Sequence, residues 1–224
     1  MKRFPKVRYN ECQRLLKNIP FFEHCTVLDI QSAAGFVADT IYSQLDKKVQ
    51  CICLEPSDAL RQRIAKHHIS INNPVEDFYS IEDNTIDIAL GLAGLHHSNN
   101  HQQTVNEAFR VLKNGATIAL CDVEKNSNIA KWLNGFVNAH NTCGHAGHFI
   151  EQGDMSHYLT LAGFERITEE VANVPWIFEN WESCLLFIRD FFSIECPRST
   201  LENAIHEHFT IIEHNDHIEL PWQL

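Results

Sequence analysis

The residues best suited to bind a ligand follow two short apolar segments. Residues 31–35 (QSAAG) form a turn of small side chains after the segment TVLDI, and Glu55 ends the segment CICLE. Small residues let a ligand approach the backbone closely, and a carboxylate can accept hydrogen bonds from both hydroxyls of a ribose. The acid alone is a weak signal for a ribose, because acids end many strands.

Two adjacent histidines follow a third apolar segment. His96 and His97 come directly after TIDIALGLAGL. Histidine titrates near neutral pH and can act as a general base or contact a substrate. We expect one of the pair to pack the loop, and the role of the other stays open.

A histidine- and glycine-rich segment, residues 142–154, contains residue types that bind metals. Cys143, His145, His148 and Glu151 are possible ligands by type. However, C-x-H-x₂-H is not a standard structural zinc spacing, and accidental clusters are common in a chain with fourteen histidines. We therefore predict no metal site here and interpret the segment as a mobile loop that covers the active site.

Strands and helices alternate through the first half of the chain. Segments that are apolar on both faces are typical of parallel sheets covered by helices. We predict strands at 26–30, 49–56, 68–71, 85–95 and 115–123, and helices at 8–18, 36–45, 58–68 and 101–114, with Ser57 capping the third helix and Gly115 ending the fourth. This alternation predicts an α/β protein with an open, Rossmann-like doubly wound sheet.

The second half is less regular. We predict helices at 126–141, 151–164, 179–192 and 199–209, a strand at 164–176, and a hairpin in the tail that turns at Asn215–Asp216. We expect one domain over residues 1–224. Its core spans about 22–125 and 152–224, with a helix and lid loop at about 126–151 and a helical insertion at about 177–208.

Composition narrows the function classes. The net charge is −11, and a nucleic-acid-binding protein needs a basic face. The N-terminal group Lys2, Arg3, Lys6 and Arg8 is better interpreted as a solvated arm. Neither an apolar run of about 20 residues nor an export signal is present. We therefore expect a cytoplasmic protein with no membrane or nucleic-acid partner, in which the eight cysteines are thiols and Cys51 and Cys53 are buried.

Four segments in order resemble a known family. They are similar to the ordered motifs of class I S-adenosylmethionine-dependent methyltransferases of the small-molecule type. The four segments are VLDIQSAAGFVAD, CLEPSDALRQRI, VEDFYSIEDNTIDIALGLAGLHHSNN and NEAFRVLKNGATIALCDV. The resemblance implies a seven-stranded sheet of order 3-2-1-4-5-7-6 with strand 7 antiparallel. It also implies S-adenosyl-L-methionine as cofactor and methyl transfer to oxygen, nitrogen or carbon of a small-molecule acceptor, by a monomer or homodimer.

The same resemblance implies roles for individual residues. Asp29 lies beneath the cofactor, and Gln31, Ser32, Ala33 and Gly35 belong to the loop around its methionine part. Glu55 binds the ribose hydroxyls, and the adenine is contacted by Pro56, Ser57, Val75 and Glu76. Leu92, Ala93, His96 and His97 line the cofactor and substrate side.

Residues on the helix predicted at 126–141 and on the loop after it are candidates to contact the methyl acceptor. Trp132, Phe136 and His140 could line an acceptor pocket, although Trp132 and Phe136 are equally well explained as core. A base is needed only if the acceptor must lose a proton. His97, His140 and His145 are the candidates for that role.

Three departures from the family pattern keep alternatives open. Gln31 and Ala33 stand where the family usually has glycines, and we expect their β-carbons to disfavour a positive φ. Pro74 stands where an acid often receives the adenine amino group. One alternative is a methyltransferase-like protein that lost catalysis and acts as a binding or regulatory subunit. The other is a nucleotide-cofactor oxidoreductase, which would need the G-x-G-x-x-G loop that this chain lacks.

Overall fold

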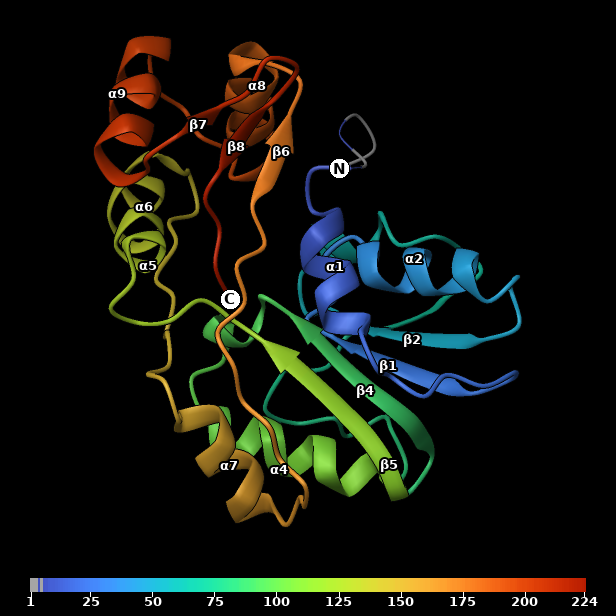
Figure 1. Cartoon of the computed structure of the whole chain (residues 1–224). Helices are drawn as coiled ribbons and strands as arrows, with labels where there is room; N and C mark the ends of the chain where they lie inside the picture. Colours follow the sequence, from blue (N-terminus) through green and yellow to red (C-terminus); the bar gives the residue numbers. More distant parts are fainter. Residues whose placement is uncertain (1–3, 5) are drawn as a thin grey trace. The chain divides into compact units, whose positions relative to one another are not determined.

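The computed structural model describes residue 4 and residues 6–224, so Lys2 and Arg3 lie outside the described part. By their internal contacts, the described residues divide into two compact units. Unit 1 contains the described part of Met1–Arg14 together with Val123–Glu151 and Glu170–Leu224; unit 2 contains Leu15–Asp122 and Gln152–Glu169 (Figure 1). Residues 170–224, which we expected to continue the core of the first half, therefore belong to the other unit.

Unit 2 is built on a parallel sheet. In the described residues its five strands are β1 (Thr26–Ile30), β2 (Gln50–Leu54), β3 (Ile69–Ile71), β4 (Ile86–Leu92) and β5 (Leu112–Cys121), in the order β3-β2-β1-β4-β5. Every adjacent pair is parallel. The predicted α/β class, the five strands and their order are confirmed, whereas the predicted sixth and seventh strands do not join this sheet.

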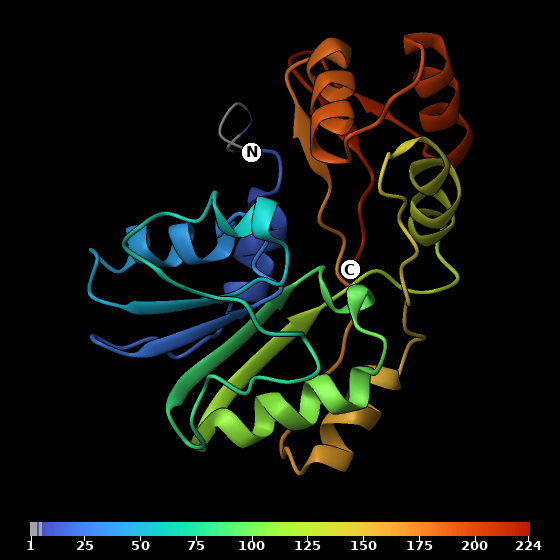
Figure 2. The same ribbon diagram turned by 180° about the vertical axis from the view of Figure 1, so that it is seen from behind.

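Helices cover both faces of this sheet. Helix α2 (Phe36–Gln44) packs on β1 and β2, while α4 (His101–Val111) and α7 (Asp154–Ala162) lie side by side on the opposite face (Figures 1 and 2). Large apolar side chains from the sheet, including Leu28, Ile30 and Leu54, are buried beneath them. The doubly wound arrangement follows because the central strands β1 and β4 are buried on both faces.

Two helix predictions in unit 2 need correction. The helix expected at 58–68 is a single turn, α3 (Asp58–Arg61), and none of its residues is buried, so it lacks an apolar face to pack. Helix α4 ends at Val111 rather than before Gly115, because Leu112 already pairs with Ile86 in β5. Gly115 lies inside β5 with φ of 77°, where the register of the two strands shifts.

Unit 1 combines helices with a small antiparallel sheet. Its elements are α5 (Asn128–Trp132), the π-helical turn η2 (Leu133–Val137), α6 (Asn138–His140), β6 (Trp176–Phe178), α8 (Trp181–Phe191), α9 (Arg198–His208), β7 (Ile212–Glu213) and β8 (Ile218–Leu220). Helix α1 (Tyr9–Leu16) begins in this unit. The predicted helices and the hairpin turn at Asn215–Asp216 are confirmed, with a π-turn inside the helix at 126–141.

The strand predicted at 164–176 is wrong for residues 164–171, which are mostly exposed and lack an apolar alternation. Residues 172–174 pair antiparallel with residues 222–224 through a single bridge, Asn173–Gln223, and Trp176 begins β6. Strand β6 pairs antiparallel with β8, and β7 completes a three-stranded sheet of order β6-β8-β7. The last strands of the chain thus pair with one another and not with β5.

Aromatic residues dominate the core of unit 1. Trp176 stacks on Trp222 with ring centroids 3.9 Å apart and meets Phe187 edge to face at 5.2 Å. The Trp176 indole N–H donates to the buried carboxylate of Glu11 at 2.7 Å, and Glu11 also pairs with Arg8. Arg8 is buried, so the predicted solvated arm does not include it.

In the part of the chain that the structure describes, no helix is both long and apolar enough to cross a membrane. All eight cysteines are free thiols. Cys51 and Cys53 are buried in β2, as predicted, and burial raises the pKa of the Cys51 thiol to about 12.

Candidate functional site

The strand register of unit 2 brings three strand ends to one level. Ile30 pairs with Leu54, and Leu54 pairs with Ile71, so the residues that follow are neighbours at the carboxyl edge of the sheet. Open α/β sheets bind ligands at this edge. A cleft of about 510 Å³ lies there, a volume typical of small-molecule sites. It is lined by Gln31, Glu55, Pro56, Ser57, Leu60, Asn72, Pro74, Val75, Glu76 and His97.

The loop after β1 adopts left-handed backbone conformations at three positions. The φ angles are 55° at Gln31, 50° at Ala33 and 79° at Gly35. Gln31 and Ala33 therefore adopt a positive φ although their β-carbons disfavour it, so the departure from glycine does not exclude this loop conformation. Left-handed conformation costs a non-glycine residue roughly 1–2 kcal/mol, and the loop offsets part of it with hydrogen bonds. Ser32 N–H donates to the Leu54 carbonyl at 3.0 Å and Ala33 N–H to Glu55 at 2.7 Å.

The Gln31 side chain packs against a glycine on the neighbouring strand end. A β-carbon at Gly94 would lie 2.7 Å from both Cβ and Cγ of Gln31, which is too close for any side chain. Gly94 therefore makes room for Gln31. Among the described residues, the buried Gln31 Oε1 finds no hydrogen-bond partner, so the cleft wall contains an available acceptor.

Glu55 is held in one orientation by backbone donors. Its Oε2 accepts from Ala33 N–H at 2.7 Å and its Oε1 from Ser57 N–H at 2.8 Å. Ser57 therefore contributes its backbone N–H rather than the side-chain cap we predicted for α3. Burial raises the pKa of Glu55, and the two backbone donors oppose that rise. Each oxygen has a second lone pair, so two acceptor positions remain for a ligand.

A second carboxyl group lies one residue before the end of β1. Asp29 is 1% exposed, and its Oδ2 has no hydrogen-bond partner in the described part of the chain. Burial, reinforced by the negative charge of Glu55, raises the pKa of Asp29 to about 7, against the N–H of Ala38, which lowers it. Asp29 does not line the cleft.

Glu76 connects two loops at the cleft. Its Oε1 accepts from the Ser98 hydroxyl at 2.9 Å and from Asn99 N–H at 2.6 Å. Because Glu76 follows β3 while Ser98 and Asn99 follow β4, this carboxylate holds the two strand ends together. Val75 and Pro74 form the apolar wall beside it.

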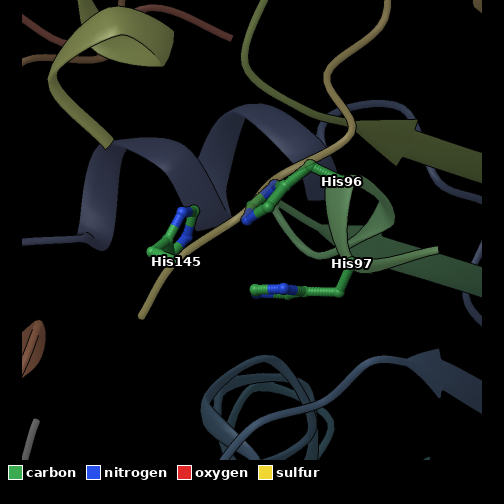
Figure 3. A group of neighbouring side chains, drawn as sticks. All are labelled: His96, His97 and His145. Atoms are coloured by element: carbon green, nitrogen blue, oxygen red, sulfur yellow. The ribbon is translucent and has the colours of Figure 1, made fainter. Parts of the chain in front are cut away.

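The two adjacent histidines have different surroundings. His96, on the short helix η1 (Leu95–His97), donates its backbone N–H to Asp122 Oδ2 at 2.9 Å, and its Nδ1 lies 2.7 Å from Asp122 Oδ1. A carboxylate only accepts, so Nδ1 carries the proton. His97 lines the cleft instead; Figure 3 shows the side chains of both residues. His96 is thus the histidine that packs the loop.

The structure places the other predicted cofactor residues around the cleft or behind it. Gln31, Glu55, Pro56, Ser57, Val75, Glu76 and His97 line it, whereas Ser32, Ala33, Gly35, Leu92, Ala93 and His96 do not. Sequence reasoning missed Leu60 and Asn72. Asn72 directly follows β3, a strand end that would have drawn attention to it; Leu60 lies in the shortened helix α3 and had no such signal.

The remaining candidates belong to unit 1. Trp132 is fully buried against Phe192 and Phe209, which favours the core interpretation. Phe136 is partly buried and stacks on His140 at 4.3 Å, and His140 Nδ1 lies 2.9 Å from the Phe136 carbonyl. His145, also drawn in Figure 3, stacks on Phe149.

The possible metal ligands of this loop do not act as one group. Glu151 pairs with Lys125 at 2.9 Å. Neither Cys143 nor His148 falls in a potential metal-binding cluster of the described residues.

Comparison with known proteins assigns the class. Residues 28–120 match the family model described as a methyltransferase domain. YcgJ from Bacillus subtilis is structurally similar, with a TM-score of 0.67 and 15% identity over 95% of each chain. A proposed methyltransferase from Bacillus halodurans has a TM-score of 0.66 and 18% identity over 95% of this chain and 94% of its own.

An S-adenosylmethionine-dependent methyltransferase from Thermotoga maritima has a TM-score of 0.58 and 18% identity over 81% of this chain and 80% of its own. No curated protein matches the chain. The fold is that of class I S-adenosylmethionine-dependent methyltransferases. The match to the methyltransferase-domain family model covers residues 28–120, which include most of strand β1 and all of strands β2, β3 and β4.

Proposed function

We propose that the cleft of unit 2 binds S-adenosylmethionine and that the chain transfers a methyl group to a small-molecule acceptor. The observation that supports this most directly is the state of Glu55. Its carboxylate lines the cleft, is held by two backbone donors, and keeps acceptor capacity for a pair of hydroxyls. Such a fixed acceptor suits a ribose.

The residues present fit this ligand. The unpartnered oxygen of Gln31 can accept from an ammonium group, and it lies in the loop expected at the methionine part. Val75 and Pro74 supply an apolar wall for a planar base. The cleft volume of about 510 Å³ also suits a molecule of this size.

S-adenosylmethionine carries its methyl group on a sulfonium, which is already an activated leaving group. The protein then acts mainly by alignment and exclusion of water, and such positioning is worth roughly 7–11 kcal/mol. In this chain the aligning groups are Glu55, Gln31 and the loop 31–35, with Asp29 beneath.

His97 is the histidine we propose as general base where the acceptor must lose a proton. It is the one candidate of the three that lines the cleft of unit 2. His140 and His145 remain further candidates, and Phe136 remains a candidate for acceptor contact. The net charge of −11 favours a small acceptor over a polyanion, and we propose a cytoplasmic monomer or homodimer.

Calorimetric titration with S-adenosylmethionine and with its demethylated product tests the proposal. Wild type should bind both ligands. Glu55→Gln should weaken binding about tenfold or more, because an amide can no longer accept from two backbone donors and two ribose hydroxyls together. Asp58→Asn is the matched control: it removes an exposed carboxylate three residues away and should bind as wild type does.

Two results would count against the proposal. Absence of binding to wild type at millimolar ligand would favour the catalytically inactive binding protein. Equal binding by wild type and Glu55→Gln, with both folded by circular dichroism, would show that the ribose is not held at Glu55.

A further inference from the structure

The hairpin β7–β8 gathers a cluster of possible metal ligands in unit 1. Its turn is closed by His214 N–H, which donates to the His217 carbonyl at 2.9 Å, and Glu213 pairs with Ile218. Residues opposite each other and residues two apart on a strand share one face. His214, His217 and Glu219 therefore point to the same side, while Ile218 and Leu220 are buried on the other.

The three side chains bring their ligand atoms close together. The Nε2 atoms of His214 and His217 lie 3.5 Å and 3.4 Å from Glu219 Oε1, and all three ligand atoms are within 4.8 Å of one another. For zinc bonds of 2.0–2.2 Å, tetrahedral ligands are separated by about 3.3–3.5 Å. The two distances to Glu219 already match that spacing.

A fourth residue orients one of these ligands from behind. Asp216 Oδ1 lies 2.8 Å from His217 Nδ1. Metal-binding histidines characteristically donate their other ring N–H to a carboxylate, which fixes the tautomer and strengthens the ligand. With Nδ1–H donated to Asp216, Nε2 is the ring nitrogen left to bind a metal ion. In the ion-free chain this atom is hydrogen-bonded to Glu219 Oε1 at 3.4 Å, and a metal ion would replace the proton between them.

We propose that His214, His217 and Glu219 bind one divalent transition metal ion, zinc in the first place, with Asp216 as the outer carboxylate. Imidazole and carboxylate ligands suit zinc, and water completes the coordination. The ion joins the two strands at the turn end of the hairpin. It thereby stabilises β8, whose Leu220 lies in the core of unit 1.

The ligands can reach the required geometry. The rings of His214 and His217 are stacked with centroids 4.2 Å apart and planes 13° from parallel, so the rings must rotate for their lone pairs to converge. Both side chains are partly exposed, at 41% and 29%. Rotation about χ2 is therefore open to them without repacking the core.

A second cluster in unit 2 provides an internal comparison. His68 Nε2 lies 3.0 Å and His67 Nε2 3.7 Å from Asp39 Oδ1. The His68 side chain is fully buried, and the His67 ring is stacked on Tyr42 at 4.1 Å, so neither ring turns freely. Replacing a histidine of this second cluster should leave zinc binding at the hairpin unchanged.

The test is calorimetric titration of the full chain, without a polyhistidine tag, with zinc chloride. Wild type should bind one equivalent at the hairpin. His217→Asn and Glu219→Gln should lose that binding, and Asp216→Asn should weaken it about 10- to 100-fold. His67→Asn and His157→Asn, each of which removes one exposed histidine elsewhere, should bind as wild type does.

Two further measurements complete the test. Cobalt(II) should give the visible absorption of a nitrogen- and oxygen-ligated site in wild type and not in Glu219→Gln. Zinc should raise the melting temperature of wild type but not of that variant, because a ligand that binds only the folded state stabilises it. Binding that survives both His217→Asn and Glu219→Gln, or that His67→Asn abolishes, would overturn the proposal, as would no zinc binding by wild type.

Discussion

Burial changes the chemistry of two neighbouring carboxyl groups in unit 2. Asp29 and Glu55 lie on adjacent strands, and desolvation raises the pKa of both. Two backbone N–H donors compensate the burial of the Glu55 carboxylate, whereas one Asp29 oxygen has no hydrogen-bond partner in the described residues. The structure thus separates a carboxyl group held by backbone donors in the cleft from one that is partly protonated near neutral pH.

The raised pKa of Asp29 predicts a pH-dependent stability. The folded chain keeps a proton up to about pH 7, whereas the unfolded chain releases it near pH 4. The stabilising contribution is therefore complete below about pH 4 and is lost as the pH rises through 7. Asp29→Asn stays neutral, so its stability relative to wild type should increase between pH 5 and pH 8 by on the order of a few kcal/mol.

Urea unfolding of both proteins at the two pH values measures this difference. Asp58→Asn, which removes an exposed carboxylate, serves as the control and should follow wild type. The same difference between wild type and Asp29→Asn at both pH values would mean that Asp29 is charged in the folded state throughout.

Among the elements, the loops after β1 and β4 depend on each other. Gln31 has a positive φ and a side chain that occupies the space above Gly94. The departure from glycine at 31 is accommodated by glycine at 94. Loop 31–35 and the segment that leads to His97 are therefore one packed assembly at the cleft.

This coupling predicts the outcome of a double-mutant cycle. Gly94→Ala should destabilise the chain by about 1–3 kcal/mol, because its β-carbon overlaps Gln31. Gln31→Gly removes both overlapping atoms, so the double variant should recover much of the loss. Chemical denaturation at constant pH measures the four stabilities.

The control for this cycle is Gly135→Ala. A β-carbon at Gly135 meets nothing within 4 Å, and the residue lies inside helix η2, where alanine is favoured. It should be neutral or stabilising. Additive effects of the changes at 31 and 94 would contradict the packing argument.

At the scale of the whole molecule, unit 1 is assembled from segments far apart in sequence. Glu11 comes from the first segment and Trp176 from the last, and they meet through a 2.7 Å hydrogen bond. Arg8 pairs with the same carboxylate and lies 5.2 Å from the ring centre of Phe191. The N-terminal residues therefore help to hold β6 and α8.

Loss of the Glu11 carboxylate should destabilise unit 1 strongly. Glu11→Ala leaves the buried Arg8 unpaired, and breaking one partner of a buried pair costs about 3–5 kcal/mol. Hydrogen exchange should show reduced protection in β6 and α8. Glu213→Ala removes an exposed carboxylate from the same unit and should leave that protection unchanged; equal loss in both variants would contradict the role of Glu11.

The local sequence pattern was sufficient to predict much of the fold and the main residues of the cleft. Strands β1, β2 and β4 are mostly buried and are visible as apolar runs in the sequence, and the order of β1 to β5 followed from the family resemblance. Glu55 was recognisable because an acid directly follows such a run. The tail hairpin was equally visible from Asn215–Asp216, because turn chemistry is local.

Tertiary packing alone decided the rest. It set the positive φ of Gln31 and Ala33, which depends on Glu55 and Gly94 rather than on the loop itself. It selected His97 over His96 for the cleft, because Asp122, 26 residues further on, binds His96. It also paired β6 with β8 instead of β5. Each outcome depends on contacts between segments that are distant in sequence. The energies of such contacts cannot be inferred from a local sequence pattern.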